Sequence, residues 1–419
     1  MTCLSFAASG VNTAAAASVT YGDVNGDGKI NSADYSLMKR YILGNINDFP
    51  VSDGLKIGDV SGDGKINSVD YSLMKRYILG NIDEFPAAKS QTPGVLYIGR
   101  FDFSDSAGPK FAWSESTIKA NFQGTGISVN LKSSGDNWFN VIVDGMVKTP
   151  INVPAGTSAP ITLASNLTNG NHTLELVKRT EASIGDVQFL GFTVTGGSLL
   201  APPTPSSRRI EFIGDSITCG YGDEGANQNQ TFTAKNENPY LAYGALTARF
   251  LNADPITVCW SGKGVVRNYG GQSGDFMPAL YPQILAYNST LLWDTSKWIP
   301  QVVVINLGTN DFSTAIPDKN AFTTAYTALL NRVRGQYPDA HIYCAIGPML
   351  YGDALTAVRG CLNTAVNQKN SSGDKKVHYI EFPGQDAANG YGEDWHPSLK
   401  THQIMADQLT TQIRKDLGW

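Results

Sequence analysis

The sequence predicts a multidomain protein that combines a small α-helical unit, an antiparallel β-sandwich of the jelly-roll type, and a three-layer α/β domain with a parallel sheet. Three observations lead to this prediction. A pattern that starts at Gly22 recurs almost unchanged from Gly58. Residues 95–194 hold short runs rich in Val, Ile, Thr and Phe, separated by Gly, Asn and Pro, as in an antiparallel sandwich. From residue 210 onward, β-rich runs alternate with helical patterns, which favours a parallel sheet covered by helices.

Length and composition limit the classes of protein to consider. The 419 residues and the formal net charge of -5 suggest two to four domains of ~100–200 residues each. Sparse charge argues against nucleic acid as a partner, and no apolar run reaches the ~18 residues of a membrane span. The five cysteines show neither metal-ligand spacing nor a small disulfide framework. Residues 1–20 are small and Ala-rich, and we expect a linker remnant or an artificial chain end there rather than a secretory signal.

The repeated pattern predicts two structural calcium sites. Oxygen donors recur at the loop positions of a calcium-binding loop, and a glycine follows the third donor to allow the sharp turn, which suits a hard cation with several oxygen ligands. The residue after that glycine, Lys29 in the first loop and Lys65 in the second, would supply a backbone carbonyl. The expected ligands are Asp23, Asn25, Asp27, Lys29, Asn31 and Asp34 in the first loop, and Asp59, Ser61, Asp63, Lys65, Asn67 and Asp70 in the second.

One helical pattern follows each loop, at residues 32–43 and 68–79. Residues 21–87 therefore resemble a type I dockerin, the module that attaches enzymes to the cohesins of a cellulosome scaffold. The resemblance implies a cohesin partner contacted by Ser32, Ala33, Lys39 and Arg40 and by Ser68, Val69, Lys75 and Arg76. The alternative is a calcium-stabilised fold that has no partner.

Residues 94–200 form the expected jelly roll, and a Pro-rich connection separates it from the domain of residues 207–419. The sandwich carries few titratable residues, so we interpret it as a companion domain that could shape the cleft of its neighbour. In the α/β domain we expect β-rich runs such as 210–213 and 302–307 and helices at residues 240–251, 321–336, 355–368 and 399–417, with a further segment around 276–287.

Ser216 is the candidate nucleophile of the α/β domain. The run IEFIGDS delivers it to the carboxyl end of the first predicted strand, where open α/β sheets place their ligands. A serine hydroxyl needs a base to take its proton and fixed donors for the oxyanion that it creates. His396, near the chain's end, is the candidate base. Gly262 and Asn310 each follow a β-rich run, so together with the Ser216 backbone N–H they are the candidate oxyanion hole.

The order of these residues resembles the SGNH, or GDSL, hydrolase superfamily, whose motif residues are Ser, Gly, Asn and His. The match falls on Gly214 to Ser216, Gly262, Asn310 with Asp311, and His396. The superfamily usually carries Asp three residues before the His, where this chain has Glu393, with Asp394 next to it. Either carboxylate would orient His396 in a triad, or a backbone carbonyl would do so in a Ser-His dyad. We slightly favour the dyad.

The sandwich and the α/β domain together resemble carbohydrate esterase family 2, through the runs GRFDF, FAWSESTIKANFQGT, GDSITCGYG, SGKGV, GTNDF and DWHPS. The resemblance implies a serine carboxylic-ester hydrolase, secreted and cellulosome-associated, that removes acetyl groups from xylan and glucomannan and needs no cofactor for catalysis. The candidates for an aromatic platform that binds the sugar chain are Trp395, Trp298 and Trp260. The expected ligands are acetylated plant polysaccharide and cellulose or another β-glucan.

Two alternatives remain at this stage. One is a glucan-binding module on an esterase scaffold with weak or no catalysis. The other is a lipid esterase of the same superfamily, which ranks third because long apolar runs near the expected cleft are missing.

Overall fold

The computed structural model describes residues 20–61, 65–82, 85, 94–157 and 159–419. The expectations for residues 1–19, for Asp63 and for most of the linker before the sandwich lie outside these residues. The chain divides into two compact units, Met1–Lys89 and Ser90–Trp419, and each is described by itself. None of the helices in the described ranges combines the length and the apolar character that crossing a lipid bilayer requires.

The first unit contains α1 (Ser32–Ile42), α2 (Gly54–Gly58) and α3 (Ser68–Ile78). Asn31 and Asn67 cap the two long helices, because each side-chain oxygen accepts a backbone N–H of the first turn. Asp34 and Asp70 complete capping boxes by accepting the N–H groups of those asparagines. The repeated sequence thus gives two loop-helix units, which share a buried core of Val24, Met38, Phe49, Ile57, Val60, Met74 and Phe85.

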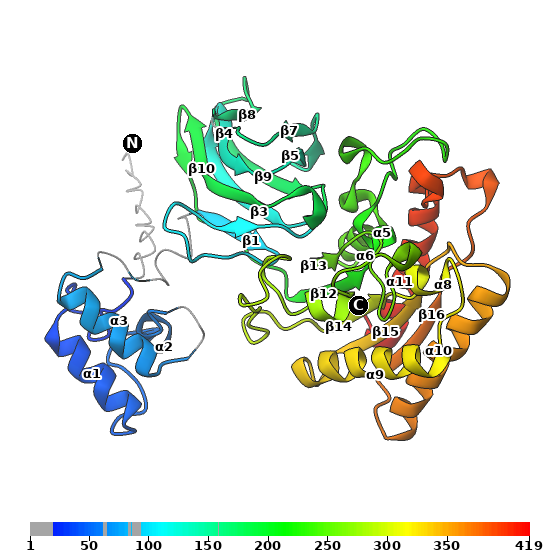
Figure 1. The fold of residues 1–419 in the computed structure, drawn as a ribbon. Helices are drawn as coiled ribbons and strands as arrows, with labels where there is room; N and C mark the ends of the chain where they lie inside the picture. Colours follow the sequence, from blue (N-terminus) through cyan, green and yellow to red (C-terminus); the bar gives the residue numbers. More distant parts are fainter. Residues whose placement is uncertain (1–19, 62–64, 83–84, 86–93, 158) are drawn as a thin grey trace, which may run out of the picture. The chain divides into compact units, whose positions relative to one another are not determined.

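The second unit begins with a sandwich of two antiparallel sheets (Figure 1). One sheet has the order β1-β3-β9-β5-β6, with β11 beside β3 and β7 beside β5, and the other has the order β2-β10-β4-β8. Inward-facing side chains such as Phe122, Val129 and Phe139 are fully buried between the sheets. The strands are β1 (Val95–Ile98), β2 (Lys110–Phe111), β3 (Thr117–Gly124), β4 (Gly126–Ser133), β5 (Asn137–Val143), β6 (Met146–Val147), β7 (Ile151–Val153), β8 (Ile161–Ala164), β9 (Gly170–Lys178), β10 (Val187–Thr195) and β11 (Ser198–Leu199).

The rest of the second unit is an α/β domain with a five-stranded parallel sheet of order β13-β12-β14-β15-β16. The strands are β12 (Arg208–Gly214), β13 (Ala253–Cys259), β14 (Val302–Asn306), β15 (His341–Ile346) and β16 (Val377–Glu381). The helices are α5 (Ser216–Cys219), α6 (Tyr243–Phe250), α7 (Met277–Leu280), α8 (Thr309–Phe312), α9 (Lys319–Gln336), α10 (Gly352–Ser371) and α11 (Leu399–Leu417). The predicted fold class is confirmed.

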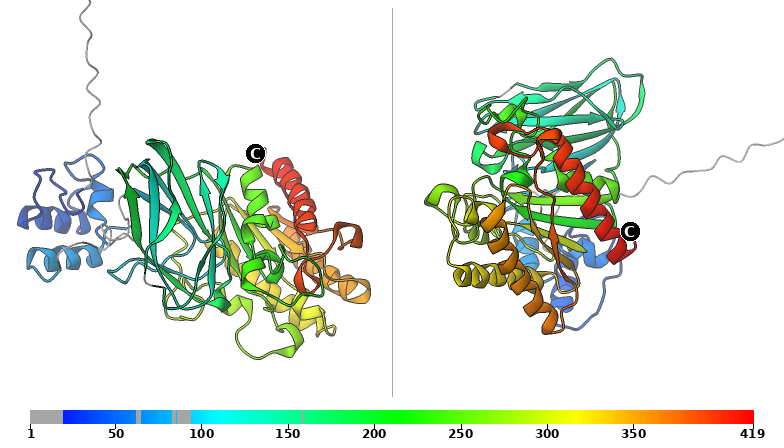
Figure 2. Two further views of the ribbon diagram at one scale, coloured as in Figure 1. Left: turned by 90° about the horizontal axis from the view of Figure 1, so that it is seen from above. Right: turned by 90° about the vertical axis from the view of Figure 1, so that its right-hand side faces the viewer.

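Helices cover both faces of this sheet (Figures 1 and 2). Ile213 of β12 packs in the core that α9 and α10 close, and its neighbour Phe212 packs in the core that α6 and α11 close. All five residues of β14 are buried, as expected for a central parallel strand. The segment around residues 276–287 differs from the expected helix, since α7 ends at Leu280. Pro282 explains this, because it lacks the backbone N–H that a longer helix would need.

Buried polar contacts join the sandwich to the α/β domain. Arg100 of the sandwich pairs with Glu211 of β12 at 2.8 Å, and both side chains are almost completely buried. The Arg179 guanidinium donates to the Glu237 carbonyl at 3.1 Å. Since removing one partner of such a pair leaves an uncompensated buried charge, these contacts fix the sandwich against the sheet.

Candidate active site

The carboxyl ends of the parallel strands open into a cavity of about 560 Å³. Ser216 follows β12, Gly262 follows β13, Asn310 follows β14, and His396 precedes α11, so the topology brings all four to one edge of the sheet. The cavity is lined by Ser216, Tyr221, Ser261, Gly262, Tyr269, Gln272, Thr309, Asn310, Ser313, Met349, Asp394, Trp395 and His396.

Ser216 begins the short helix α5, directly after the buried strand β12. Asp215 caps this helix, because its Oδ1 accepts the backbone N–H of Ile217 at 3.1 Å. Burial raises the pKa of Asp215 to about 7, and the nearby Asp311 adds to this rise. The Ser216 hydroxyl lies 2.9 Å from Nε2 of His396. A proton can therefore pass from Oγ to the imidazole.

A backbone carbonyl orients the imidazole. The oxygen of Glu393 lies 3.1 Å from Nδ1 of His396, so Nδ1 carries the hydrogen and Nε2 is free to accept one from Ser216. Tyr221 stacks on the imidazole with 4.0 Å between ring centroids. Burial lowers the pKa of His396 to about 4, which keeps the ring neutral at ordinary pH.

The geometry at His396 is built by an unusual turn. Asp394 and Trp395 both have positive φ angles, of 48° and 65°, although non-glycine residues rarely adopt that region. This turn points the Glu393 carbonyl back at the imidazole. The strain is offset by the side chain of Asp394, which accepts from Tyr221 Oη at 2.8 Å and from the Phe232 N–H at 3.0 Å.

Neither acidic side chain contacts His396 in the described part of the chain. The Glu393 carboxylate is fully buried and accepts from the Thr233 N–H, the Thr233 hydroxyl and the Asn236 amide at 2.7 to 2.9 Å. It holds the loop of residues 233–236. Of the two alternatives that the sequence left open, a carboxylate or a backbone carbonyl, it is the Glu393 carbonyl that faces Nδ1.

The residues expected to form the oxyanion hole line the same cavity as His396. Gly262 has a φ of 76°, which glycine adopts readily, and its carbonyl accepts the Tyr269 N–H at 2.8 Å. The Asn310 side-chain amide donates to the Lys263 carbonyl at 2.9 Å. Asp311 next to it accepts the N–H groups of residues 265–267 at 2.8 to 2.9 Å. These contacts set the backbone of the Gly262 loop close to Ser216.

The three tryptophans differ in position. Trp395 lines the cavity and is 56 % exposed, so its ring is available to a sugar. Trp298 does not line this cavity: it lies before β14 beside Arg209, at the opposite end of the strands. The sequence did not single out Tyr269, which also lines the cavity and is 52 % exposed. Its Gly-rich surroundings, NYGGQ, were the available signal of an exposed loop.

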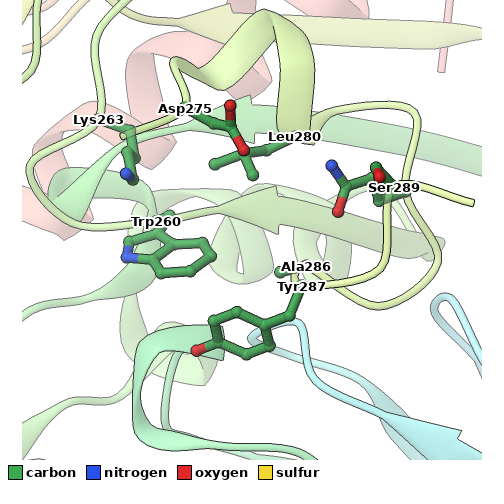
Figure 3. Close-up of a pocket in the computed structure, with 8 residues that line it drawn as sticks. Trp260, Lys263, Asp275, Leu280, Ala286, Tyr287 and Ser289 are labelled. Carbon is green, nitrogen blue, oxygen red and sulfur yellow. The ribbon is translucent and has the colours of Figure 1, made fainter. Parts of the chain in front are cut away.

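Trp260 lines a second cavity of about 310 Å³ rather than the one around Ser216. Figure 3 shows Trp260 facing Tyr287, with Lys263 and Asp275 on the other side. The Lys263 ammonium lies 5.1 Å from the centre of the Trp260 ring, and the Tyr287 ring packs edge-on at 5.2 Å. Trp260 lies two residues before Gly262 in the chain, but it does not line the cavity around Ser216.

The two loops of the first unit hold buried carboxylates that accept backbone N–H groups of their own loop. Asp34 is fully buried, and its carboxylate accepts the N–H groups of Asn25 and Asn31 at 3.1 and 3.0 Å. Asp23 accepts those of Gly26 and Gly28, both at 2.9 Å. The second loop repeats this arrangement, with Asp70 accepting from Ser61 and Asn67 at 2.9 Å. Carboxylates gathered in this way fit a hard divalent cation.

The residues expected to contact a cohesin lie on the surface of α1 and α3. Their side chains are all exposed, and they occupy equivalent positions in the two repeats: Ser32, Ala33, Lys39 and Arg40, and Ser68, Val69, Lys75 and Arg76.

The fold and the Ser-His pair define a serine esterase of the GDSL class, and the family model "GDSL-like Lipase/Acylhydrolase" matches residues 210–409. The model "Carbohydrate esterase 2 N-terminal" matches residues 97–203, and "Dockerin type I domain" matches residues 21–79. The chain belongs to carbohydrate esterase family 2 and carries a type I dockerin, a kind of domain that binds calcium.

The chain is 59 % identical over 408 residues to cellulase/esterase CelE of Acetivibrio thermocellus, covering 96 % of this chain and 50 % of CelE. It thus spans about half the length of that relative. It is 33 % identical over 352 residues to an acetylxylan esterase / glucomannan deacetylase of Cellvibrio japonicus, covering 79 % of this chain and 94 % of the relative. The structure of a family two carbohydrate esterase from Clostridium thermocellum in complex with cellohexaose has a TM-score of 0.76 at 56 % identity, covering 78 % of this chain and all of that one.

Proposed function

We propose that this chain is a carbohydrate O-acetyl esterase that removes acetyl groups from plant polysaccharides such as xylan and glucomannan. The observation that carries the proposal is the 2.9 Å contact between Ser216 Oγ and His396 Nε2, with the Glu393 carbonyl on the other ring nitrogen. The relatives from Cellvibrio japonicus are named for deacetylation of these two polysaccharides, which supports this substrate class.

The proposed mechanism is a double displacement on the acetyl group. Ser216 Oγ attacks the ester carbonyl while His396 takes its proton, and the oxyanion receives the N–H groups of Ser216 and Gly262 and the amide of Asn310. Collapse of the intermediate expels the sugar hydroxyl, which takes the proton from His396. Water then attacks the acetyl-enzyme with the same base, releasing acetate and restoring Ser216. The imidazolium is stabilised by the Glu393 carbonyl, so Ser216 and His396 act as a dyad.

Acetate release from acetylated xylan and glucomannan tests the proposal. We expect the wild-type chain to release acetate and Ser216→Ala to release none at an unchanged melting temperature. Asn310→Ala should lower kcat roughly a hundredfold or more if its amide is an oxyanion donor. Substantial turnover by Ser216→Ala would remove the serine from this role.

A second candidate function is glucan binding in the same cavity. The exposed rings of Trp395 and Tyr269 beside Ser216 favour it, since aromatic faces pack well on the apolar faces of sugars. The relative solved with cellohexaose supports a β-glucan as the ligand. Glucan affinity that persists in Ser216→Ala but falls in Trp395→Ala would establish binding apart from catalysis. A lipid esterase ranks third, because the cavity is lined largely by polar side chains and the hydroxyl-bearing ring of Tyr269.

The first unit would attach the esterase to an extracellular cellulosome. We propose that each loop holds one calcium ion, and that the exposed residues of α1 and α3 contact a cohesin of the scaffold. The exposure of Ser32 and Ala33 and of Ser68 and Val69 at the starts of the two helices supports this. Binding of a type I cohesin in the presence of calcium, lost in a variant in which both pairs are replaced by Asp, would test it.

A further inference from the structure

The loop that carries Gly262 is held by several backbone contacts. The Trp260 N–H donates to the Gly214 carbonyl at 3.3 Å, which continues the pairing of β13 with β12. The Gly262 carbonyl accepts the Tyr269 N–H at 2.8 Å. These partners belong to the α/β domain, and they leave the N–H of Ser261, between the two contacts, without a partner in that domain among the described residues.

The sandwich supplies that partner. The Ser261 N–H donates to Oε2 of Glu181 at 2.7 Å. Glu181 lies in the connection between β9 and β10, and it is only 4 % exposed. A side chain of the sandwich domain thus accepts a hydrogen bond from Ser261, the residue directly before Gly262.

Glu181 is itself held in place on every side. Its own N–H donates to the Glu237 carboxylate at 2.9 Å, and Oε1 accepts the hydroxyl of Ser183. The Lys178 ammonium, which is completely buried, donates to the Glu181 carbonyl at 3.3 Å. Burial lowers the pKa of Lys178 to about 8, and the charges of Glu237 and Glu181 oppose this fall. The Glu181 backbone and both of its carboxylate oxygens therefore have partners that hold them in position.

The neighbouring contacts strengthen this connection. Tyr287 of the α/β domain donates its hydroxyl to the carbonyl of Ala182, the residue after Glu181. The Tyr287 ring in turn packs edge-on against Trp260 (Figure 3). The connection between β9 and β10 thus contacts the α/β domain at two points. Glu181 accepts the N–H of Ser261 in the Gly262 loop, and the Ala182 carbonyl accepts the hydroxyl of Tyr287, which packs against Trp260.

We propose that Glu181 is a positioning residue that fixes the oxyanion loop from the sandwich domain. Glu181 holds the peptide plane before Ser261, and Tyr269 holds the plane after Gly262, so a rotation of the plane between them, which carries the Gly262 N–H, has to proceed with both of its neighbours held in place. Gly262 has no side chain to restrict that rotation. This inference rests on the proposed function, because the Gly262 N–H matters for an acetyl ester only if it receives the oxyanion. It makes the sandwich part of the catalytic unit.

The test compares Glu181→Ala and Glu181→Gln, with Glu115→Ala as a matched control. Glu115 is also a buried carboxyl of the sandwich, and it accepts the hydroxyl of Thr257 on β13 without contacting the Gly262 loop. Each variant is assayed for kcat and KM on 4-nitrophenyl acetate well below its melting temperature. Hydrogen exchange of the amides of residues 260–263 is measured in parallel.

We expect Glu181→Ala to lose roughly tenfold to a hundredfold in kcat with little change in KM, because a hole that is misplaced by about 1 Å loses transition-state contacts. The amides of residues 260–263 should exchange faster. Glu181→Gln keeps an acceptor oxygen, and it should restore kcat and slow exchange. Glu115→Ala should change the melting temperature, but it should change neither kcat nor the exchange rates of residues 260–263.

The proposal is overturned if Glu181→Ala keeps the wild-type kcat and exchange rates, or if Glu115→Ala loses as much kcat as Glu181→Ala does. Failure of the wild type to release acetate from polysaccharides would contradict the proposed function instead. The exchange rates of residues 260–263 would still decide whether Glu181 fixes the loop.

Discussion

At the scale of single residues, His396 acts as a base only while its ring is neutral. Burial lowers its pKa to about 4, and the Glu393 carbonyl and the Asp394 charge offset only part of this fall. The neutral imidazole, which is the active form, therefore persists at pH values below the ordinary pKa of histidine. It is lost only as the pH falls through the lowered pKa of His396 in the folded protein. We therefore expect the acid limb of kcat/KM near pH 4, below the reference value of ~6.5 for a free imidazole. A pH-rate profile on a soluble acetyl ester measures it, and a limb at or above the reference value would contradict this environment.

Replacing Glu393 by Gln separates a dyad from a triad. The buried carboxylate accepts three hydrogen bonds from Thr233 and Asn236, so the variant should lose about 1–3 kcal/mol in the free energy of unfolding. The backbone carbonyl remains on His396, so kcat should stay within several-fold and the acid limb should not move. In a triad the equivalent change lowers kcat ~10⁴-fold. Urea unfolding and steady-state kinetics on the same preparation distinguish the two outcomes.

The sequence indicated which residues gather around the cavity, and it favoured a backbone carbonyl over a carboxylate as the group that orients His396 without locating the turn that presents it. Ser216, Gly262 and Asn310 follow three adjacent strands, and the ends of parallel strands converge at one edge whatever the details of their side chains. The Glu393 carbonyl faces His396 only because Asp394 and Trp395 adopt positive φ, which no local pattern in EDWHPS indicates. The position of Trp298 was not predictable for a related reason, since spacing along the chain does not tell which end of the sheet a loop occupies.

At the scale of elements, Asp311 fixes the segment that follows the Gly262 loop. Its fully buried carboxylate accepts the N–H groups of Val265, Val266 and Arg267. Asp311→Ala should lower the free energy of unfolding by about 2–4 kcal/mol, because it leaves these donors unpaired. Asp318→Ala is the control, since Asp318 accepts the single exposed N–H of Ala321 at the start of α9, and it should cost about 1 kcal/mol. Equal losses in urea unfolding would show that the buried contacts of Asp311 add nothing.

The regular elements were predictable because periodicity carries most of their signal. The strand β14, with the sequence VVVIN, has four apolar residues in a row and is buried on both faces, and the buried residues of α11 recur every three or four positions, as in an amphipathic helix. The buried charges between the domains were not predictable. Glu181, Lys178 and Glu237 look in the sequence like solvated loop and strand residues, and only the packing of the sandwich on the sheet shows that they are enclosed.

At the scale of the whole molecule, the two compact units have separate cores, so their stabilities should respond to different ligands. In the first unit, Asp23 and Asp34 lie in one loop and Asp70 in the other, all of them buried. Gathered carboxylates repel one another without a cation, and an ion that binds only the folded state stabilises it by about 2.7 kcal/mol at a hundred times its Kd. The second unit has no such loop among its described residues.

Removal of calcium should therefore unfold the first unit and leave the esterase intact. With a chelator such as EDTA, we expect the full chain to lose helical circular dichroism and cohesin binding at unchanged acetate release, and excess calcium should restore both. Asp34→Ala and Asp70→Ala should each weaken the response to calcium by removing one loop's buried carboxylate. Asp53→Ala, a change outside both loops in the same unit, is the control and should respond like the wild type. If chelation abolished acetate release while the second unit stayed folded, a divalent cation would have to act at the active site, and the metal-free dyad mechanism would be wrong.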